Sequence, residues 1–233
     1  MNERCCLVTG VGHGTGRALV ERFADDGYRV AMLARRTDRL AAFERELAGT
    51  RAYPCDVADA RELERTVARV IADLGPPAVV IHNAVSAERG TFLEIEPAGL
   101  EQAFRVNCMG LLHLARATVP AMIERGGGAL ICTGNTAAYR GRAAYAGFAP
   151  SKAAQRVLAE SMARELGPRG IHVAYVMIDA VIDLRWTRRA WPDRPDSFFI
   201  KPRDIAAEVF HVAHQPRSAW SFRVEIRPHG ENW

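Results

Sequence analysis

The sequence predicts one α/β domain built on a doubly wound parallel sheet with helices on both faces. Short apolar runs alternate with amphipathic helical patterns along the chain, which is the order of βαβ units. Most of these runs are apolar at consecutive positions, as expected for strands that are buried on both faces. The 233 residues suit a single domain, 1–233, without an internal repeat or a low-complexity linker.

Seven apolar runs are candidate strands, and the run at 51–55 is the weakest. They span residues 5–9, 29–34, 51–55, 78–82, 129–133, 172–178 and 222–227. The patterns between them place apolar residues on one helical face. Helices are expected at 16–26, 59–74, 99–125 with an interruption near Pro120, 149–166 and 204–214.

Residues 183–202 show no regular pattern. Twenty such residues inside a compact domain usually form a functional loop. The aromatic residues of this segment, among them Trp186 and Trp191, suit a lid over an apolar ligand in a cleft. The alternative is a surface excursion packed against the domain.

Composition and charge argue against several classes of protein. The net charge is +4 and the 31 basic residues are scattered, so no nucleic-acid partner is expected. No run of about 18 apolar residues predicts a membrane span, and no signal-peptide pattern precedes the first strand. The five cysteines have no metal-ligand spacing, which predicts no metal site and reduced thiols in a cytoplasmic protein.

A glycine-rich turn follows the first candidate strand and opens a helix. Glycine lets the backbone turn tightly and approach a pyrophosphate, and the helix start offers free N–H groups. In this context the turn predicts a nucleotide site. Its residues are Gly10, Gly12, His13, Gly14, Thr15 and Gly16.

The end of the second strand indicates which nucleotide is bound. A carboxylate there would bind the ribose 2′-hydroxyl of NAD, but the strand ends at Ala34 and Arg35 follows. Arg35 can pair with a 2′-phosphate, and His13 is expected beside the same group. We therefore expect NADP(H) to be preferred over NAD(H). The alternative is that Arg35 and Arg36 are solvated charges at a helix start.

Several motifs occur in a fixed order within residues 4–214. After the glycine turn come Asp56-Val57, then Asn83-Ala84, then Asn107 three residues before a glycine, then Lys152 in a Ser-Lys-Ala-Ala context. In these motifs the chain resembles the short-chain dehydrogenase/reductase family. The resemblance implies a Rossmann-like sheet of about seven strands and hydride transfer between a nicotinamide cofactor and a small substrate.

The resemblance also assigns roles. Asp56-Val57 would hold the adenine, Lys152 would hold the nicotinamide ribose, and Asn107 would support Lys152 through a water. Asn83, Ala84 and Ile182 would complete the cofactor site. A homodimer or homotetramer is implied, formed through the helices at 99–125 and 149–166. The second of these helices carries small residues, Ala153, Ala154, Ala159 and Ala163.

The chain departs from the family where the chemistry lies. Phe148 stands four positions before Lys152, where the family has its catalytic tyrosine, and Asn135 stands where it has a serine. Asp179-Ala180 replaces the family's Pro-Gly after the sixth strand. In the family the tyrosine exchanges the proton of the reacting oxygen, and a phenyl ring cannot do so.

Tyr145 is the candidate replacement, seven positions before Lys152. This spacing is similar to that of the enoyl-thioester reductases, a divergent branch of the family. Gly147 and Pro150 indicate, however, that the helix begins after Tyr145. The alternative is a loop tyrosine that lines the cleft. The amide of Asn135 can also donate to a carbonyl.

Other polar residues are weaker candidates. Asp179 or Asp183 could act as a base, or could cap a backbone turn. Arg140 and Arg142 lie on the substrate side and could recognise a carboxylate, or could be solvated.

Two functions remain open from the sequence. The first is an NADP(H)-dependent oxidoreductase that acts on a carbonyl or activated double bond of a small, apolar substrate with an atypical proton donor. The second is a pseudoenzyme that binds NADP(H) as a sensor or partner protein without turning it over.

Overall fold

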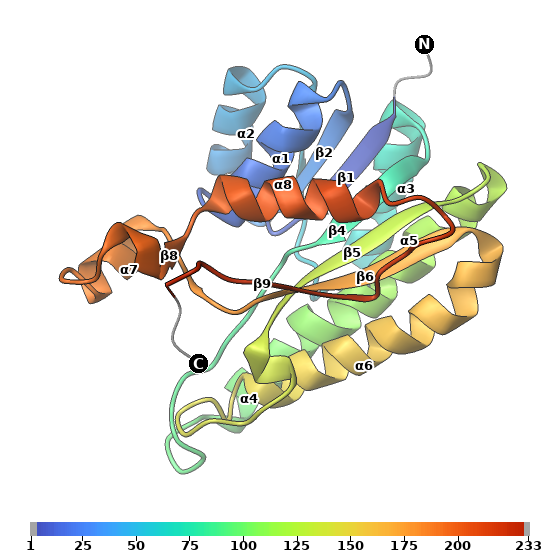
Figure 1. Ribbon diagram of the computed structural model, residues 1–233. Coiled ribbons are helices and arrows are strands. Elements are labelled where there is room, and N and C mark those ends of the chain that lie inside the picture. The colour runs from blue at the N-terminus through green and yellow to red at the C-terminus, as the bar shows by residue number, and fades with distance from the viewer. Residues whose placement is uncertain (1–3, 231–233) are drawn as a thin grey trace.

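The structure is a computed structural model that describes residues 4–230. Seven parallel strands form one twisted sheet in the order β3-β2-β1-β4-β5-β6-β9 (Figure 1). The chain therefore winds outward twice from β1, as the alternation of elements predicted. The strands are β1 Cys5–Thr9, β2 Arg29–Ala34, β3 Thr50–Pro54, β4 Pro77–His82, β5 Gly128–Asn135, β6 Ile171–Ile178 and β9 Arg223–Ile226.

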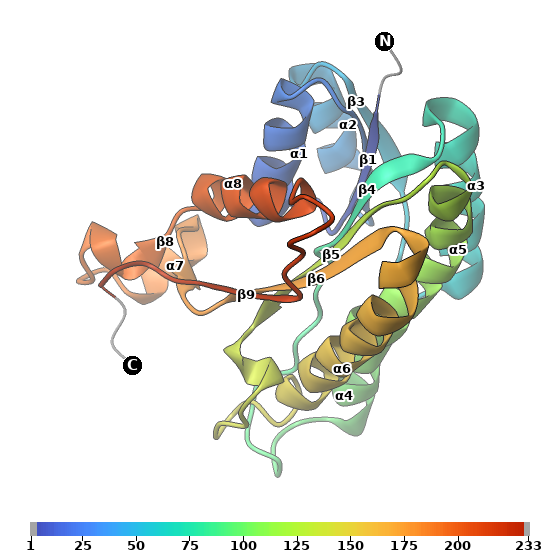
Figure 2. The ribbon, with the colours of Figure 1, turned by 45° about the vertical axis from the view of Figure 1, so that its right-hand side comes forward.

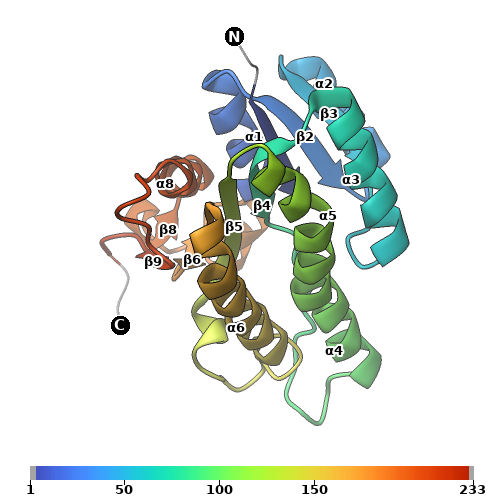
Figure 3. The ribbon, with the colours of Figure 1, turned by 90° about the vertical axis from the view of Figure 1, so that its right-hand side faces the viewer.

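Helices cover both faces of this sheet (Figure 3). Successive residues of β1 point to opposite faces, so Leu7 packs in one apolar core and Val8 in the other. One core lies under α1 (Thr15–Asp25), α2 (Thr37–Glu46) and α8 (Pro202–Ala213). The other lies under α3 (Ala60–Leu74), α5 (Gly110–Glu124) and α6 (Ala149–Leu166).

The helix expected at 99–125 is longer and is interrupted elsewhere. It runs from α4 (Pro97–Phe104) through a π-helical turn at Arg105–Met109 into α5, and Pro120 lies inside α5. The wider π turn, rather than the proline, marks the irregularity, and it contains Asn107. Among the described residues this is the one helix long and apolar enough to span a membrane, but half of that apolar window is buried. It packs against α3 and α6 as a core helix.

Two expectations about local structure were wrong. Helix α2 was not predicted, because only Leu40 and Phe43 of its ten residues are buried and the apolar pattern is weak. The lid segment, residues 183–202, is not structureless: it contains α7 (Arg185–Ala190), a 3₁₀ turn and β8 (Phe199–Ile200). Strand β8 pairs with β7 (Val181–Ile182), which fixes the two ends of the segment together (Figure 2).

The small residues of α6 do not all face outward. Ala159 is fully buried in the domain core, whereas Val157 is about half exposed. Ala153, Ala154 and Ala163 are partly buried. Association of copies through this helix stays a prediction.

Gly134 near the end of β5 provides space for the buried ring of Tyr175 on β6. A Cβ atom on Gly134 would overlap this ring. We predict that Gly134→Ala lowers the free energy of unfolding by about 1–3 kcal/mol, because the ring has no free volume to move into. Urea denaturation measures the change. Gly167→Ala is the matched control, since a Cβ there meets no atom within 4 Å; equal effects of the two substitutions would contradict the prediction.

Candidate active site

The glycine turn lies against the end of β4. Gly10 has a φ of +71°, and a Cβ there would lie 2.5 Å from the Cα of Ala84. A Cβ on Gly16 would lie 2.6 Å from the carbonyl oxygen of Gly10. Because both positions lack space for a side chain, the turn needs glycine at each.

Asn83 fastens this turn to the neighbouring strands. Its Nδ2 donates to the carbonyl oxygen of Gly10 at 3.0 Å, and its Oδ1 accepts from the hydroxyl of Thr133 on β5 at 3.1 Å. Its backbone N–H donates to the hydroxyl of Thr9 at 3.2 Å. The side chain and the backbone N–H of Asn83 thus join the carboxyl ends of β1, β4 and β5.

His82 lies beneath this junction and is structural. Its Nδ1 lies 3.3 Å from the hydroxyl of Thr9, and the ring is fully buried. Burial, with a smaller contribution from the charge of Lys152, lowers the pKa of His82 to about 3. The imidazole is therefore neutral at physiological pH.

A cavity of about 560 Å³ extends from the glycine turn along the ends of β2 and β4. The structure brings together here most of the residues predicted to bind the cofactor, which are Gly10, Gly12, Gly14, Thr15, Gly16, Arg35, Asp56, Val57, Asn83, Ala84 and Ile182. The carboxylate of Asp56 accepts the backbone N–H of Ala58 at 3.0 Å, which shapes the turn at this end. The dimensions and glycine-lined wall fit an extended dinucleotide.

Three arginines surround the end of this cavity beyond β2. Arg35 and Arg36 were noted in the sequence, and Arg39 joins them from α2. A Cβ on Gly12 would lie 3.3 Å from a guanidinium nitrogen of Arg39, so this side chain reaches over the glycine turn. Arg39 was not expected here, because α2 buries only Leu40 and Phe43 and its apolar pattern is weak.

His13 does not line this cavity, contrary to expectation. Its ring packs edge-on against Phe43 of α2, with 5.2 Å between the ring centroids. It borders a separate hollow beside α1 and α8 instead. The contact with Phe43 holds the imidazole on this side, outside the lining of the large cavity.

The lid segment covers the glycine turn. Leu184 and Trp186 line the large cavity, and a Cβ on Gly14 would lie 2.5 Å from a methyl group of Leu184. Arg188 donates two hydrogen bonds to the carboxylate of Asp183, and Lys201 donates to the same carboxylate at 2.7 Å. Hydrogen bonding to Arg188 is the main cause that holds the pKa of Asp183 well below its usual range. Asp183 therefore anchors the lid, and its carboxylate is not free to act as a base.

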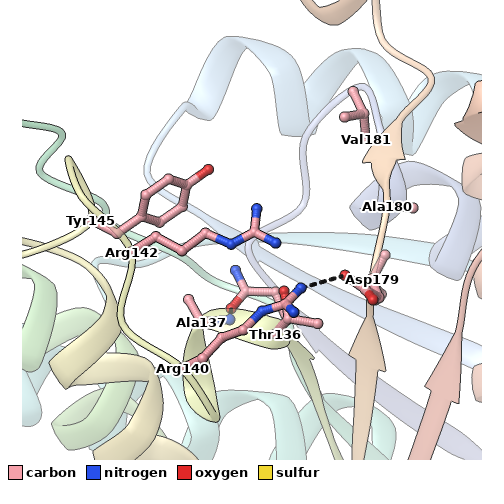
Figure 4. Close-up of a pocket in the computed structure, with 10 residues that line it drawn as sticks. Thr136, Ala137, Arg140, Arg142, Tyr145, Asp179, Ala180 and Val181 are labelled. Atoms are coloured by element: carbon pink, nitrogen blue, oxygen red, sulfur yellow. Dashed lines mark hydrogen bonds and ion pairs between the residues drawn. The ribbon is translucent and has the colours of Figure 1, made fainter. Parts of the chain in front are cut away.

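A second, smaller cavity of about 180 Å³ opens beside β7 at the ends of β5 and β6 (Figure 4). We call it the Tyr145 hollow. Val181 lines it and the next residue, Ile182, lines the large cavity, so the two spaces border adjacent residues of β7. Its walls are Asn135, Thr136, Ala137, Arg140, Arg142, Tyr145, Ile178, Asp179, Ala180 and Val181.

The Tyr145 hollow holds the predicted replacement for the missing tyrosine. Tyr145 is more than one-third exposed, while Phe148 is buried and does not line the hollow; their ring centroids are 6.3 Å apart. Asn135 lines the same hollow. Its Oδ1 accepts the backbone N–H of Ala137 at 3.1 Å, which leaves its amide group to donate.

The backbone fixes the position of Tyr145. Ala144 before it has a φ of +62°, in the left-handed region that non-glycine residues rarely adopt. The carbonyl oxygen of Ala144 accepts the N–H of Gly90 at 3.2 Å. Gly147 lies so close to Glu88 that a Cβ there would be 2.6 Å from the Glu88 Cβ. The loop after β4 therefore holds the loop of Tyr145, and α6 begins only at Ala149, as expected.

Lys152 does not line either cavity, contrary to the role expected from the resemblance. Its side chain is buried, and its ammonium donates to the carbonyl oxygen of Thr133 at 3.1 Å and to Oε1 of Gln155. Burial lowers the pKa of Lys152 to about 8. In this arrangement the ammonium bonds to two protein oxygens inside the domain.

Gln155 connects Lys152 with Asn107. Its Nε2 donates to the carbonyl oxygen of Asn107 at 2.8 Å while its Oε1 accepts from Lys152. Asn107 itself bonds through its side chain to the backbone of Ser86, at 2.8 and 3.0 Å, and to Ser151 at 2.9 Å. A glutamine side chain thus occupies the position between Asn107 and Lys152 where a water was expected. No sequence signal distinguished Gln155 from other polar residues of α6.

The buried ammonium has a consequence for stability. Folded Lys152 loses its proton near pH 8, whereas the unfolded chain does so near 10.5. Between these values the unfolded state binds more protons, so this residue makes stability rise with pH, by roughly 3 kcal/mol at about 1.4 kcal/mol per pKa unit. We predict that Lys152→Met removes this rise. Unfolding free energies of both proteins from pH 7 to 11 test this, and parallel pH profiles would refute it.

The chain matches known proteins over most of its length. The family described as short chain dehydrogenase matches residues 4–188. D-erythrulose reductase of Gallus gallus is 33% identical over 171 residues, which are 73% of this chain and 68% of the relative.

Solved structures agree with this assignment. A short-chain dehydrogenase from Rhodopseudomonas palustris is 29% identical with a TM-score of 0.83, covering 97% of this chain and 99% of that one. A metagenomic short-chain oxidoreductase in complex with NADP is 27% identical with a TM-score of 0.84, covering 97% of each chain. The glycine turn, the sheet order and these matches together show that the chain belongs to the short-chain dehydrogenase/reductase family of oxidoreductases.

Proposed function

We propose that this protein is an NADP(H)-dependent oxidoreductase in which Tyr145 replaces the family's catalytic tyrosine. One observation carries the proposal: Tyr145 lines a hollow whose wall at Val181 is next to Ile182 of the cofactor cavity, while Phe148 is buried. A phenolic hydroxyl is thereby available where a substrate would approach the cofactor, although the usual position has none.

The charge around the cofactor cavity supports NADP(H). Arg35 and Arg39 both line it with no ion pair or hydrogen bond from their side chains among residues 4–230, whereas Arg36 pairs with Asp38 at 3.4 Å. A 2′-phosphate is an anion that one or two guanidinium groups bind well. The similar metagenomic oxidoreductase was solved in complex with NADP.

We predict that the protein binds NADPH at least tenfold more tightly than NADH, equivalent to about 1.4 kcal/mol. Arg35→Gln combined with Arg39→Gln should abolish this preference by weakening NADPH binding alone. Fluorescence titration of each nucleotide measures both effects. Arg61→Gln combined with Arg65→Gln, both on the exposed face of α3, is the control for loss of two positive charges. Equal affinity of the unchanged protein for NADPH and NADH would contradict the assigned preference for NADP(H).

Different residues of the chain have different roles around the substrate. The bound cofactor supplies or accepts the hydride. The hydroxyl of Tyr145 donates a proton to the reacting oxygen during reduction, and the free amide of Asn135 donates a hydrogen bond to it. Ser86, which lines the cofactor cavity, is held by Asn107, so the Asn107–Gln155–Lys152 chain supports that wall.

We predict that Tyr145→Phe lowers kcat at least tenfold, or about 1.4 kcal/mol of barrier, because the ring stays and only the proton donor is lost. NADPH affinity should not change. Steady-state kinetics and the same titration separate the two effects. Tyr139→Phe is the matched control, as Tyr139 is also exposed but does not line the hollow. Unchanged kcat in Tyr145→Phe removes this residue from the mechanism.

A second function has its own support. The inward ammonium of Lys152 and the buried Phe148 leave the cofactor cavity without two groups of the family's catalytic set. These features favour a protein that binds NADP(H) as a sensor or partner without turnover. Tight NADPH binding with no oxidation by any aldehyde, ketone or enoyl thioester would select this function.

A further inference from the structure

Arg142 is the unpaired charge of the Tyr145 hollow. Its side chain extends from the loop after β5 into the hollow, beside the ring of Tyr145 (Figure 4). Within residues 4–230 the guanidinium of Arg142 makes no ion pair or hydrogen bond. A guanidinium aimed into a cavity with no protein partner is placed to bind an anion from solution.

The second arginine of the hollow is already neutralised. Arg140 lies 3.8 Å from the carboxylate of Asp179, the one acidic residue on the wall, and the two are drawn joined in Figure 4. Two guanidinium groups and one carboxylate leave one positive charge, and it belongs to Arg142. Asp179 therefore balances Arg140, which argues against its expected role as a free base.

The remaining side chains of the hollow are mainly donors. Asn135 and Tyr145, which carry an amide and a hydroxyl donor, both line it, and Asp179 is paired with Arg140. The aromatic residues of the lid do not line the hollow; Trp186 lines the cofactor cavity instead. The apolar substrate expected from those aromatic residues thus does not match a wall with one net positive charge and free donors.

The size of the hollow and the shape of the guanidinium limit which anions can bind. The hollow has a volume of about 180 Å³, against about 560 Å³ for the cofactor cavity, so it suits a small ligand. The planar fork of a guanidinium matches the two oxygens of a carboxylate. A carboxylate on Arg142 would leave the rest of a short molecule beside Tyr145 and Asn135.

We propose that the Tyr145 hollow binds small oxo acids, with Arg142 holding the carboxylate and Tyr145 and Asn135 meeting the carbonyl oxygen. This assignment rests on the proposed oxidoreductase function. The carbonyl carbon receives a hydride from the reduced nicotinamide, and the π electrons of C=O move to the oxygen, which takes the proton of Tyr145. The oxo acid becomes a hydroxy acid, the nicotinamide is oxidised, and water returns the proton to Tyr145.

The test compares acids with their neutral esters. The panel contains 2-oxobutanoate, 3-oxobutanoate and 4-oxopentanoate, each with its methyl ester, and is assayed with NADPH. For at least one pair we expect kcat/KM at least tenfold higher for the acid. Arg142→Gln should lower the value for that acid at least tenfold, mainly through KM, and leave its ester within twofold. Arg61→Gln should change neither. The proposal is overturned if every ester has the same kcat/KM as its acid. It is also overturned if Arg142→Gln lowers kcat/KM equally for acid and ester.

A binding experiment separates this proposal from the proposed function. Each acid, and methyl phosphate, is titrated calorimetrically into NADPH-loaded protein. If the acids bind and Arg142→Gln abolishes this binding, the hollow is a carboxylate site. This result would stand even if no acid is reduced and the oxidoreductase function fails. No acid binding at millimolar concentrations overturns it, as does Arg142-dependent binding of methyl phosphate that is tighter than every acid. Unchanged NADPH affinity and melting temperature show that the variant is folded.

Discussion

The site depends on the hydrogen bonds by which Asn83 joins the ends of three strands. The Asn83 side chain donates to the carbonyl oxygen of Gly10 and accepts from the hydroxyl of Thr133. The carbonyl oxygen of Thr133 in turn accepts a hydrogen bond from the ammonium of Lys152. The glycine turn, the cofactor cavity and the buried ammonium are therefore linked through one amide side chain. A buried network of this kind is stable only when each polar group has a partner, which explains why Gln155 completes it.

The replacement of tyrosine by Phe148 changes more than one side chain. Phe148 offers no polar group to Lys152, and the buried ammonium bonds to Thr133 and Gln155. The polar group facing the substrate side is now Tyr145, held by a loop that Gly90 and Glu88 fix in place. In the proposed function, the polar contact with the substrate comes from the loop before α6 and not from the start of that helix.

Much of the cofactor site was predictable because its residues are set by local rules. Gly10 and Gly16 follow a strand and open a helix, and Asp56, Asn83 and Ala84 come directly after strands β3 and β4, whose carboxyl ends lie at the same edge of the parallel sheet. Arg39 and His13 were not predictable in the same way. The first lies on a helix with a weak apolar pattern, and the second was turned away by its contact with Phe43, a residue thirty positions along the chain.

The sequence by itself determined the family, the doubly wound parallel sheet, the nucleotide turn and the absence of a hydroxyl at Phe148. These properties follow from residue type and spacing along the chain. Only the tertiary structure decided that Lys152 faces inward, that Gln155 joins it to Asn107, and that Arg142 and Tyr145 share a hollow. Such facts depend on which side chains meet across elements far apart in sequence, and the competition between hydrogen-bond partners is settled only when those elements pack.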